Sequence, residues 1–494
     1  MGDPTFEAKY HRSSPEYPTE YTRFRSELTE KVQRKRNEYR YLLNKHLIKN
    51  YEFELLDKTN LDSIKEISFL LSSSRGGSSL TVDLLKQQAQ TSIEGVRKIF
   101  SLPGEQKPYF EVAKLTPPFK DSISDNLTYV DAQDFTKIDS LLSELLPEIG
   151  YPLEETKDLY GFAINIYGRL LLQWTQIDFG PIEPAVFRIL DSVRSSSSKV
   201  GQELVYKDDT ESRIKLLHQL KSNFPGIDLR FYDSLNANMD LNSDASSINH
   251  DGFIEEPPFI IPAPWHFASN LELDNGILLM KDPSDAWRIP FWKEIFKKSS
   301  ITWLHLTRNP SDAINGLCDG WKYPYGYFSI RSPRVLNIVG YTTSSHLWTK
   351  QYAKYSTSEK VWNLLLSGHK VDLEQIAAMQ WADAHDTILT TLYNDKNYFM
   401  IKGQDDTHIG FDWLKESPEE MINFIIDKMN IQSTISLTKA VDGISTRKVQ
   451  VTPGTELCPQ RWMKAPNREK IERYSNSDLV RKVSSKLGYN KTGL

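Results

Sequence analysis

A short glycine turn between two apolar runs constrains the fold of this chain more than any other feature. Residues 64–71, IKEISFLL, are rich in strand-forming side chains, and residues 72–79, SSSRGGSS, are small and polar. Residues 80–86, LTVDLLK, then have helical spacing. This order predicts a strand, a glycine turn and a helix, the repeating unit of parallel-sheet proteins.

Three further apolar runs predict strands at residues 276–281, 301–307 and 398–402. A helix is expected from Ser311 to about Leu317, and another from Ser417 to about Met429, with Ser417 as its cap and Pro418 in its first turn. Alternating strands and helices favour an α/β fold, with a mostly parallel sheet covered on both faces.

Four regions are expected along the chain. Residues 1–59 form a charged helical extension, residues 60–120 begin the α/β domain, and residues 266–494 complete it. Between them, residues 121–265 form a mainly helical insertion, a candidate cover for the site where a substrate binds.

Composition narrows the function classes. Hydrophobic residues make up 39% of the 494 residues, enough for a large core, and the formal net charge of -5 favours no nucleic-acid partner. The two cysteines, Cys318 and Cys458, form no metal-ligand pattern, so reduced thiols and no metal site are expected. No run approaches the roughly 20 apolar residues of a membrane span, so a cytoplasmic protein without a membrane partner is expected.

The glycine turn has the chemistry of an anion site. Gly76 and Gly77 let the backbone curl its N–H groups inward, the helix adds its positive end, and Arg75 adds a forked cation. The Gly-Lys pair of the Walker motif is missing, which argues against an ordinary ATPase or kinase. The alternative is a turn that only joins strand to helix.

Several motifs together resemble those of PAPS-dependent sulfotransferases, the soluble, bacterial small-molecule type (PAPS is 3′-phosphoadenosine 5′-phosphosulfate). The turn at 74–80, SRGGSSL, is similar to the family's 5′-phosphosulfate loop, and the run 301–312, ITWLHLTRNPSD, resembles its strand ending in Arg-Asn/Asp-Pro-x-Asp. Softer matches are LLMKDP at 278–283, YFMIKGQDD at 398–406 and RWMKAPN at 461–467. The resemblance implies a P-loop-type three-layer domain with a central sheet.

The resemblance also implies roles for particular residues. The 3′-phosphate of PAPS would be held by Arg308, although the family's second donor, a Ser eight residues later, is Gly316 here. The remaining expected cofactor-binding residues are those of the turn and one C-terminal arginine: Ser74, Arg75, Gly76, Gly77, Ser78, Ser79 and Arg461.

Catalysis would rest on Arg75, which neutralises the departing phosphate, on Lys281 at a strand end, and on a general base. Glu105 in a Gly-Glu pair is the first choice for the base, with Glu94 second and His266 and His250 in reserve. Each of these also has a plain structural reading as a solvated or packed side chain. The aromatic loop at 319–328, DGWKYPYGYF, suits a small organic acceptor, or else it anchors itself on the core.

The expected function is sulfonate transfer from PAPS to a hydroxyl or nitrogen of a small-molecule acceptor, of the kind found in secondary metabolism. Two alternatives stay open. One is another nucleotide-phosphate enzyme of kinase-like type, and the other is a non-catalytic scaffold that binds PAPS or its desulfated product, PAP.

Overall fold

The structure is a computed structural model, and it describes the parts of the chain that build the α/β domain together with short pieces elsewhere. The longer described ranges are 61–89, 97–100, 181–192, 265–281, 283–321, 369–403, 409–431 and 460–489. The shorter pieces are 34, 38, 41–42, 45, 146, 149–152, 159–160, 163–164, 197–200, 203–206, 215–216, 219, 338–339, 364 and 367.

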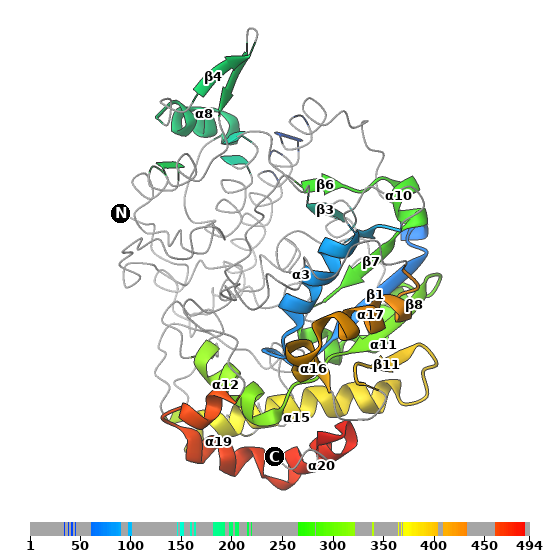
Figure 1. Ribbon diagram of the computed structural model, residues 1–494, viewed down its shortest axis with the longest axis vertical. Helices are drawn as coiled ribbons and strands as arrows, with labels where there is room; N and C mark the ends of the chain where they lie inside the picture. The colour runs from blue at the N-terminus through cyan, green and yellow to red at the C-terminus, as the bar shows by residue number, and fades with distance from the viewer. Residues whose placement is uncertain are drawn as a thin grey trace, which may run out of the picture. The chain divides into compact units, whose positions relative to one another are not determined.

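A five-stranded parallel sheet forms the centre of the domain (Figure 1). Its spatial order is β11 (Tyr398–Met400), β8 (Ser300–His305), β1 (Glu66–Leu71), β7 (Ile277–Met280) and β2 (Ile99–Phe100). All four neighbouring pairs run parallel, with β1 between β8 and β7. The carboxyl ends of these strands therefore lie at one edge of the sheet, where ligands of parallel α/β sheets usually bind.

The side chains of the central strands alternate between the two faces of the sheet, and hydrophobic residues lie on both faces, which explains why the runs are mostly apolar. Phe69 of β1 stacks on Trp303 of β8, with ring centroids 4.8 Å apart, and also contacts Trp292. Leu70 and Leu304 lie in the hydrophobic cluster of the opposite face. Both faces are therefore covered, and the buried runs leave no polar alternation.

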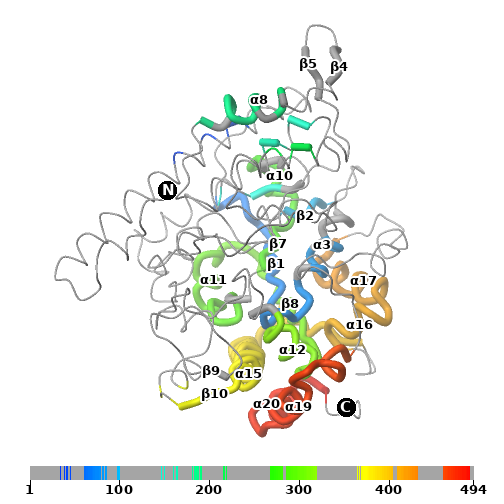
Figure 2. The backbone as a smooth tube through the Cα atoms, turned by 90° about the vertical axis from the view of Figure 1, so that its left-hand side faces the viewer, coloured from blue at the N-terminus to red at the C-terminus, as the bar shows by residue number. Residues whose placement is uncertain are grey.

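Helices cover both faces. One face packs against α3 (Ser78–Ala89), α16 (Gly410–Glu416) and α17 (Pro418–Lys428). The other carries the 3₁₀ helix η10 (Pro283–Trp287) and α11 (Ile289–Ile295), whose aromatic rings contact Phe69. Figure 2 shows α11 on one side of β1 and the α3, α16 and α17 group on the other.

A second hydrophobic cluster joins the C-terminal helices. It contains residues of α12 (Pro310–Trp321), α15 (Leu373–Leu392), α19 (Arg468–Ser475) and α20 (Asp478–Leu487). The central helix of this group is α15, which buries Trp381, Ile376 and His385 among others. Figures 1 and 2 show α15 beside α12, α19 and α20.

The remaining elements are short. Those of the α/β domain and its margins are η1 (Leu61–Ser63), α10 (Asn270–Asn275), β9 (Ile338–Val339), β10 (Val371–Asp372) and η11 (Arg461–Lys464). Those of residues 150–267 are β3 (Gly150–Pro152), α8 (Ile182–Ser192), β4 (Ser197–Val200), β5 (Glu203–Tyr206) and β6 (Trp265–Phe267).

The chain divides into two compact units. One comprises residues 1–56, 103–122 and 150–267, and the other comprises 57–102, 123–149 and 268–494. The first unit contains the antiparallel pairs β3–β6 and β4–β5, and within it Lys45 forms an ion pair with Glu183 at 3.1 Å. The second unit holds the whole five-stranded sheet, the glycine turn and Arg308.

The predicted α/β class and its parallel sheet are confirmed. Each of the four predicted strands exists, within two residues of its expected limits, and the helix predicted from Ser311 runs from Pro310 to Trp321. Ser417 does precede α17, but its side chain makes no capping hydrogen bond, so that detail was wrong. Sequence analysis did not predict α15 or the β4–β5 hairpin.

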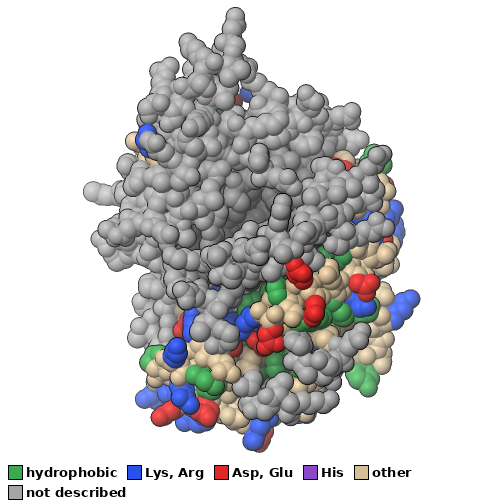
Figure 3. Space-filling model, viewed as in Figure 1, with side chains coloured by type: hydrophobic (Ala, Val, Ile, Leu, Met, Phe, Trp, Pro, Cys, Tyr) green, Lys and Arg blue, Asp and Glu red, His purple; other side chains and the backbone are tan. Residues whose placement is uncertain are grey.

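The charged side chains of the described residues are mixed in sign on the face shown in Figure 3. Among these residues no helix is both long and apolar enough to span a bilayer. The cationic side chains that lie close together are at the carboxyl edge of the sheet, in the site described below.

Candidate functional site

The glycine turn after β1 is closed by its own backbone. The carbonyl of Ser73 accepts hydrogen bonds from the Gly76 N–H at 3.1 Å and from the Ser72 hydroxyl at 3.0 Å. Arg75 and Gly77 both have positive φ, 64° and 91°. These left-handed residues turn the chain directly into α3, whose first residue is Ser78, so the N–H groups at the helix start lie at the end of the turn.

Close packing accounts for the second glycine. A Cβ on Gly77 would lie 2.0 Å from the ring of Phe411, the second residue of α16. Only a residue without a side chain therefore fits between the turn and this ring.

We call the glycine turn and the segment around Arg308 the two corners of the site. The second corner follows β8. Arg308 comes three residues after the strand, and the Asn309 side chain accepts hydrogen bonds from the backbone N–H groups of Ser311 at 2.9 Å and Asp312 at 3.5 Å. Pro310 begins α12. An Asn cap with Pro in the first turn stops the strand and starts the helix within a few residues. This local sequence fixes where Arg308 emerges.

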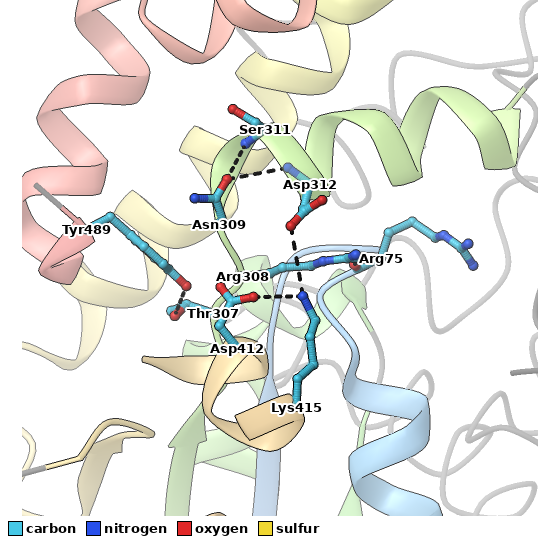
Figure 4. Close-up of polar contacts among 9 residues, drawn as sticks. All are labelled: Arg75, Thr307, Arg308, Asn309, Ser311, Asp312, Asp412, Lys415 and Tyr489. Atoms are coloured by element: carbon cyan, nitrogen blue, oxygen red, sulfur yellow. Dashed lines mark hydrogen bonds and ion pairs between the residues drawn. The ribbon is translucent and has the colours of Figure 1, made fainter. Parts of the chain in front are cut away.

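The two corners meet. The Nη1 of Arg308 donates a hydrogen bond to the backbone carbonyl of Arg75 at 3.0 Å, and Figure 4 shows both residues at the same edge. A Cβ on Gly316 of α12 would lie 3.4 Å from the Cβ of Arg75 and 3.6 Å from Nη1 of Arg308. The departure at Gly316 thus falls at the junction of the two corners.

The surroundings of Arg308 are those expected of a cation that can bind an anion. Its guanidinium lies 5.1 Å from the ring centroid of Phe411, and no carboxylate among the described residues forms an ion pair with it. Its Nε is buried and has no hydrogen-bond partner in the described part of the chain. Because a buried donor is costly to leave unsatisfied, the site favours an added acceptor at this position.

Beside Arg308, a lysine and two carboxylates form a partly buried group (Figure 4). Lys415 lies 2.8 Å from Asp412 and 3.9 Å from Asp312, and its Nζ is 5.3 Å from the Phe411 ring centroid. The side chain of Arg75 extends away from this group. Lys415 is therefore neutralised locally, whereas Arg308 is not.

Tyr489 fixes the residue before Arg308. Its hydroxyl lies 2.9 Å from the hydroxyl of Thr307, and both side chains are buried. Burial raises the pKa of Tyr489 well above its usual value, so the phenol stays protonated. The last described residue of the chain thus supports the Arg308 corner.

The C-terminal segment brings a third arginine to the site. Arg461 of η11 pairs with Asp319, and burial together with the nearby charge of Arg308 lowers its pKa. The segment is fastened to the start of α15, because Asp372 accepts hydrogen bonds from Lys470 at 2.7 Å and from the Tyr474 hydroxyl at 2.6 Å. Arg461 therefore lies within electrostatic reach of the Arg308 corner.

The other predicted site residues are placed as follows. Lys281 directly follows β7 at the same sheet edge and is buried, 6% exposed. Ser74 lies in the turn, and Ser79 is the second residue of α3. His266 lies in β6 of the other unit. Glu105, Glu94, His250, residues 322–328 and Cys458 lie outside the described residues.

Two buried histidines adjoin the site. His385 of α15 and His305 of β8 contact each other, Nδ1 to Nε2, at 2.8 Å, and both are fully buried. Burial lowers the pKa of His385 to about 3, and burial with the neighbouring ring lowers the pKa of His305 well below its usual value. Both imidazoles are therefore neutral at neutral pH.

This pair predicts acid sensitivity. Below about pH 6.5 the unfolded chain protonates His305 and His385 while the folded chain keeps both neutral, so the free energy of unfolding falls as pH falls. Between pH 6.5 and pH 5, His385 alone is expected to cost about 2 kcal/mol. Urea unfolding at both pH values should show a steeper loss for the native protein than for His385→Gln, and equal losses would contradict the burial of a neutral His385.

Gly316 supports a second prediction. Gly316→Ser adds a Cβ at ordinary contact distance and restores the hydroxyl that the sulfotransferase resemblance expects. We expect normal folding and several-fold tighter binding of PAP, worth about 1 kcal/mol for one added hydrogen bond. Calorimetric titration measures the change, and binding weakened tenfold would mean that the ligand needs the space that glycine leaves.

Several residues of the site were not found from the sequence. Phe411 and Lys415 follow a run taken only as the end of a strand, and Trp381 and His385 lie on the unpredicted helix α15. The helix itself had a readable signal, since Leu373, Ile376 and Ala377 begin an apolar stripe of helical period. The position of α15 beside the glycine turn had no such signal, because about 300 residues separate the helix from the turn in sequence.

Comparisons with known proteins add little to this geometry. No family model matches the chain, and a search of curated proteins finds no match. Two solved structures align with it. One is the sulfotransferase domain from the curacin biosynthetic pathway, at 10% identity over 86% of this chain and 97% of that chain, with a TM-score of 0.29. The other is the sulfotransferase domain from the Synechococcus PCC 7002 olefin synthase, at 11% identity over 89% and 98%, with a TM-score of 0.28. With TM-scores this low, neither likeness assigns a function to this chain.

Proposed function

We propose that this chain transfers a sulfonate group from PAPS to a hydroxyl or nitrogen of a small-molecule acceptor. The observation that carries the proposal is the contact between the glycine turn and Arg308 at one edge of one sheet. PAPS has a 3′-phosphate and a 5′-phosphosulfate on the same ribose, so its two anionic groups match a pair of such corners. The motif resemblance points to the same ligand.

The residues of the two corners fit the ligand. The 5′-phosphosulfate would be held by the backbone N–H groups and side chains of the turn, Ser74 to Ser79, at the start of α3. The 3′-phosphate would be held by Arg308, whose buried Nε has no partner in the described chain, with Arg461 close enough to share the charge. Two cations and a curled backbone suit two multiply charged groups.

The proposed mechanism is an in-line displacement. PAPS supplies the sulfonate: the S–O bond to the 5′-phosphate oxygen breaks while sulfur bonds to the oxygen or nitrogen of the acceptor, and PAP leaves with the electron pair of the broken bond. Arg75 and the turn N–H groups stabilise the charge that grows on that phosphate oxygen, and Lys281 neutralises charge on the sulfonate or the bridging oxygen. A general base takes the acceptor proton.

Glu105 is the proposed base, and its replacement gives a test of catalysis apart from binding. Glu105→Gln removes the proton acceptor but keeps the shape, so transfer should slow by about 10²–10⁴-fold while PAP affinity stays within twofold. Release of PAP in the presence of a range of phenols, alcohols and amines measures the rate. Full activity of the variant would remove Glu105 from the mechanism and turn the assignment to Glu94 or a histidine.

A thermal-stability titration tests the proposed ligand. PAP at a hundred times its dissociation constant should stabilise the protein by about 2.7 kcal/mol, without magnesium. Stabilisation by ATP with magnesium instead would favour the kinase-like alternative. Binding of PAP without transfer to any acceptor would favour the non-catalytic scaffold.

A further inference from the structure

One buried imidazole holds the ends of two neighbouring strands. His385 of α15 lies with its Nε2 3.2 Å from the hydroxyl of Ser73 and its Nδ1 2.8 Å from the Nε2 of His305. Ser73 belongs to the turn that follows β1, and His305 is the last residue of β8. Because β1 and β8 lead to the two anion corners, His385 contacts a residue just before each corner.

Ser73 is the residue through which the turn can be held. Its carbonyl accepts the hydrogen bonds of Gly76 and Ser72 that close the turn, and its hydroxyl contacts His385. The side chain is 1% exposed, so water does not compete for this hydroxyl. A fixed Ser73 therefore fixes the turn that carries Arg75 and the glycines.

The other contact of His385 is supported in turn. His305 places its Nδ1 2.7 Å from the hydroxyl of Tyr398, a residue of the next strand, β11. A neutral imidazole has one N–H donor and one acceptor nitrogen, which is the pair that a chain through both rings requires. Low pKa values keep both rings in that neutral form.

The same face of α15 also holds Arg308. Trp381 lies one helical turn before His385, and its Nε1 donates a hydrogen bond to the Arg308 carbonyl at 3.2 Å. The Trp381 and His385 rings pack edge to face with centroids 4.9 Å apart. One rigid helix face thus contacts both corners, by a different side chain at each.

We propose that His385, with Trp381, is a positioning residue that sets the spacing between the two anion corners. The proposal rests on the proposed function, because spacing matters only to a ligand that binds both corners at once. For such a ligand, the second anionic group binds almost without further loss of freedom when the corners are already correctly placed. We call His385 and Trp381 the brace. Replacing either residue should therefore weaken the binding of a ligand that contacts both corners more than the binding of a ligand that contacts one corner.

Three nucleotides separate these effects. PAP has one phosphate at the 3′ position and one at the 5′ position of its ribose, whereas 5′-AMP and 3′-AMP each have only one of the two. Calorimetric titration should show that His385→Leu lowers PAP affinity about tenfold or more, as expected for the loss of two buried hydrogen bonds, while each monophosphate loses no more than about twofold. Trp381→Phe, which removes the indole N–H together with part of the buried ring, should give the same pattern with a smaller change.

Milder variants and a matched control protect the test from a folding defect. His385→Gln and His385→Asn each place an amide near one of the two ring nitrogens and should recover part of the PAP affinity. Ile376→Val trims a buried side chain on the same helix without touching a polar contact and should leave all three affinities unchanged. Equal losses for PAP and the monophosphates in His385→Leu, or an unchanged PAP affinity, would overturn the proposal.

Hydrogen exchange decides the positioning role without any ligand. In His385→Leu, the backbone amides of the turn and of Asn309 and Ser311–Ala313 should lose protection together, whereas Ile376→Val should preserve both. Loss at neither corner, or at one corner alone, would overturn the proposal. Failure of the native protein to bind PAP would refute the proposed function instead, and the exchange result would still stand for or against the brace.

Discussion

Gly77→Ala is expected to destabilise the protein by about 2–6 kcal/mol and to abolish PAP binding. The new methyl group would lie 2.0 Å from the Phe411 ring in a residue whose φ is 91°. Backbone strain of this kind costs about 1–3 kcal/mol, and forced packing adds a similar amount. The turn could relieve both only by moving away from Phe411, and its N–H groups would then leave the positions that an anion needs. Urea unfolding and PAP titration measure the two effects.

A glycine on the same site provides the control. Gly316→Ala adds a Cβ that meets its neighbours at 3.4 Å or more, so it should fold normally and keep PAP affinity within a few-fold. Combining Gly77→Ala with Phe411→Leu removes the ring but keeps the strained φ, so part of the stability should return. A Gly77→Ala protein with native stability and native PAP affinity would show that the turn does not require this close approach.

Arg308→Ala should raise the dissociation constant of PAP by about 100-fold and remove most of its thermal stabilisation. The guanidinium is the one cation of the corner without a carboxylate partner among the described residues, and charged hydrogen bonds of this type contribute about 1.5–3 kcal/mol each. The variant also loses the hydrogen bond to the Arg75 carbonyl, which loosens the glycine turn.

Two further variants separate charge, geometry and general effects. Arg308→Lys keeps the charge but loses the planar fork, so its PAP affinity should lie between those of the native protein and Arg308→Ala. Arg481→Ala removes an exposed arginine that forms an ion pair with Asp478 on the same helix, and it should change nothing at the site. A native PAP affinity in Arg308→Ala would mean that the 3′-phosphate is held elsewhere.

The sheet could be predicted because its strands are buried on both faces. Residues 66–71 and 300–305 are apolar runs bounded by polar turns, and in parallel sheets such runs need no alternation to be recognised. The corners could be predicted for the same reason, since Gly76, Gly77 and the Asn309–Pro310 pair act on their immediate neighbours. Local chemistry of this kind is readable from a single sequence.

What could not be predicted depends on contacts between distant segments. β2 has two residues, too few for a periodic signal, and it exists because Ile99 pairs with Ile277. His385 is one histidine among ten, and only the packing of α15 against β1 and β8 distinguishes it from the others. The close approach of Phe411 to Gly77 likewise follows from the fold, not from either residue's neighbours.

A crystal structure of the protein soaked with PAP tests the central claim most directly. The account predicts one nucleotide per chain, its 5′-phosphate against the N–H groups of Gly76 to Ser79 and its 3′-phosphate on the guanidinium of Arg308. Density for PAP elsewhere, or for separate molecules at the two corners, would contradict the claim that one ligand bridges them.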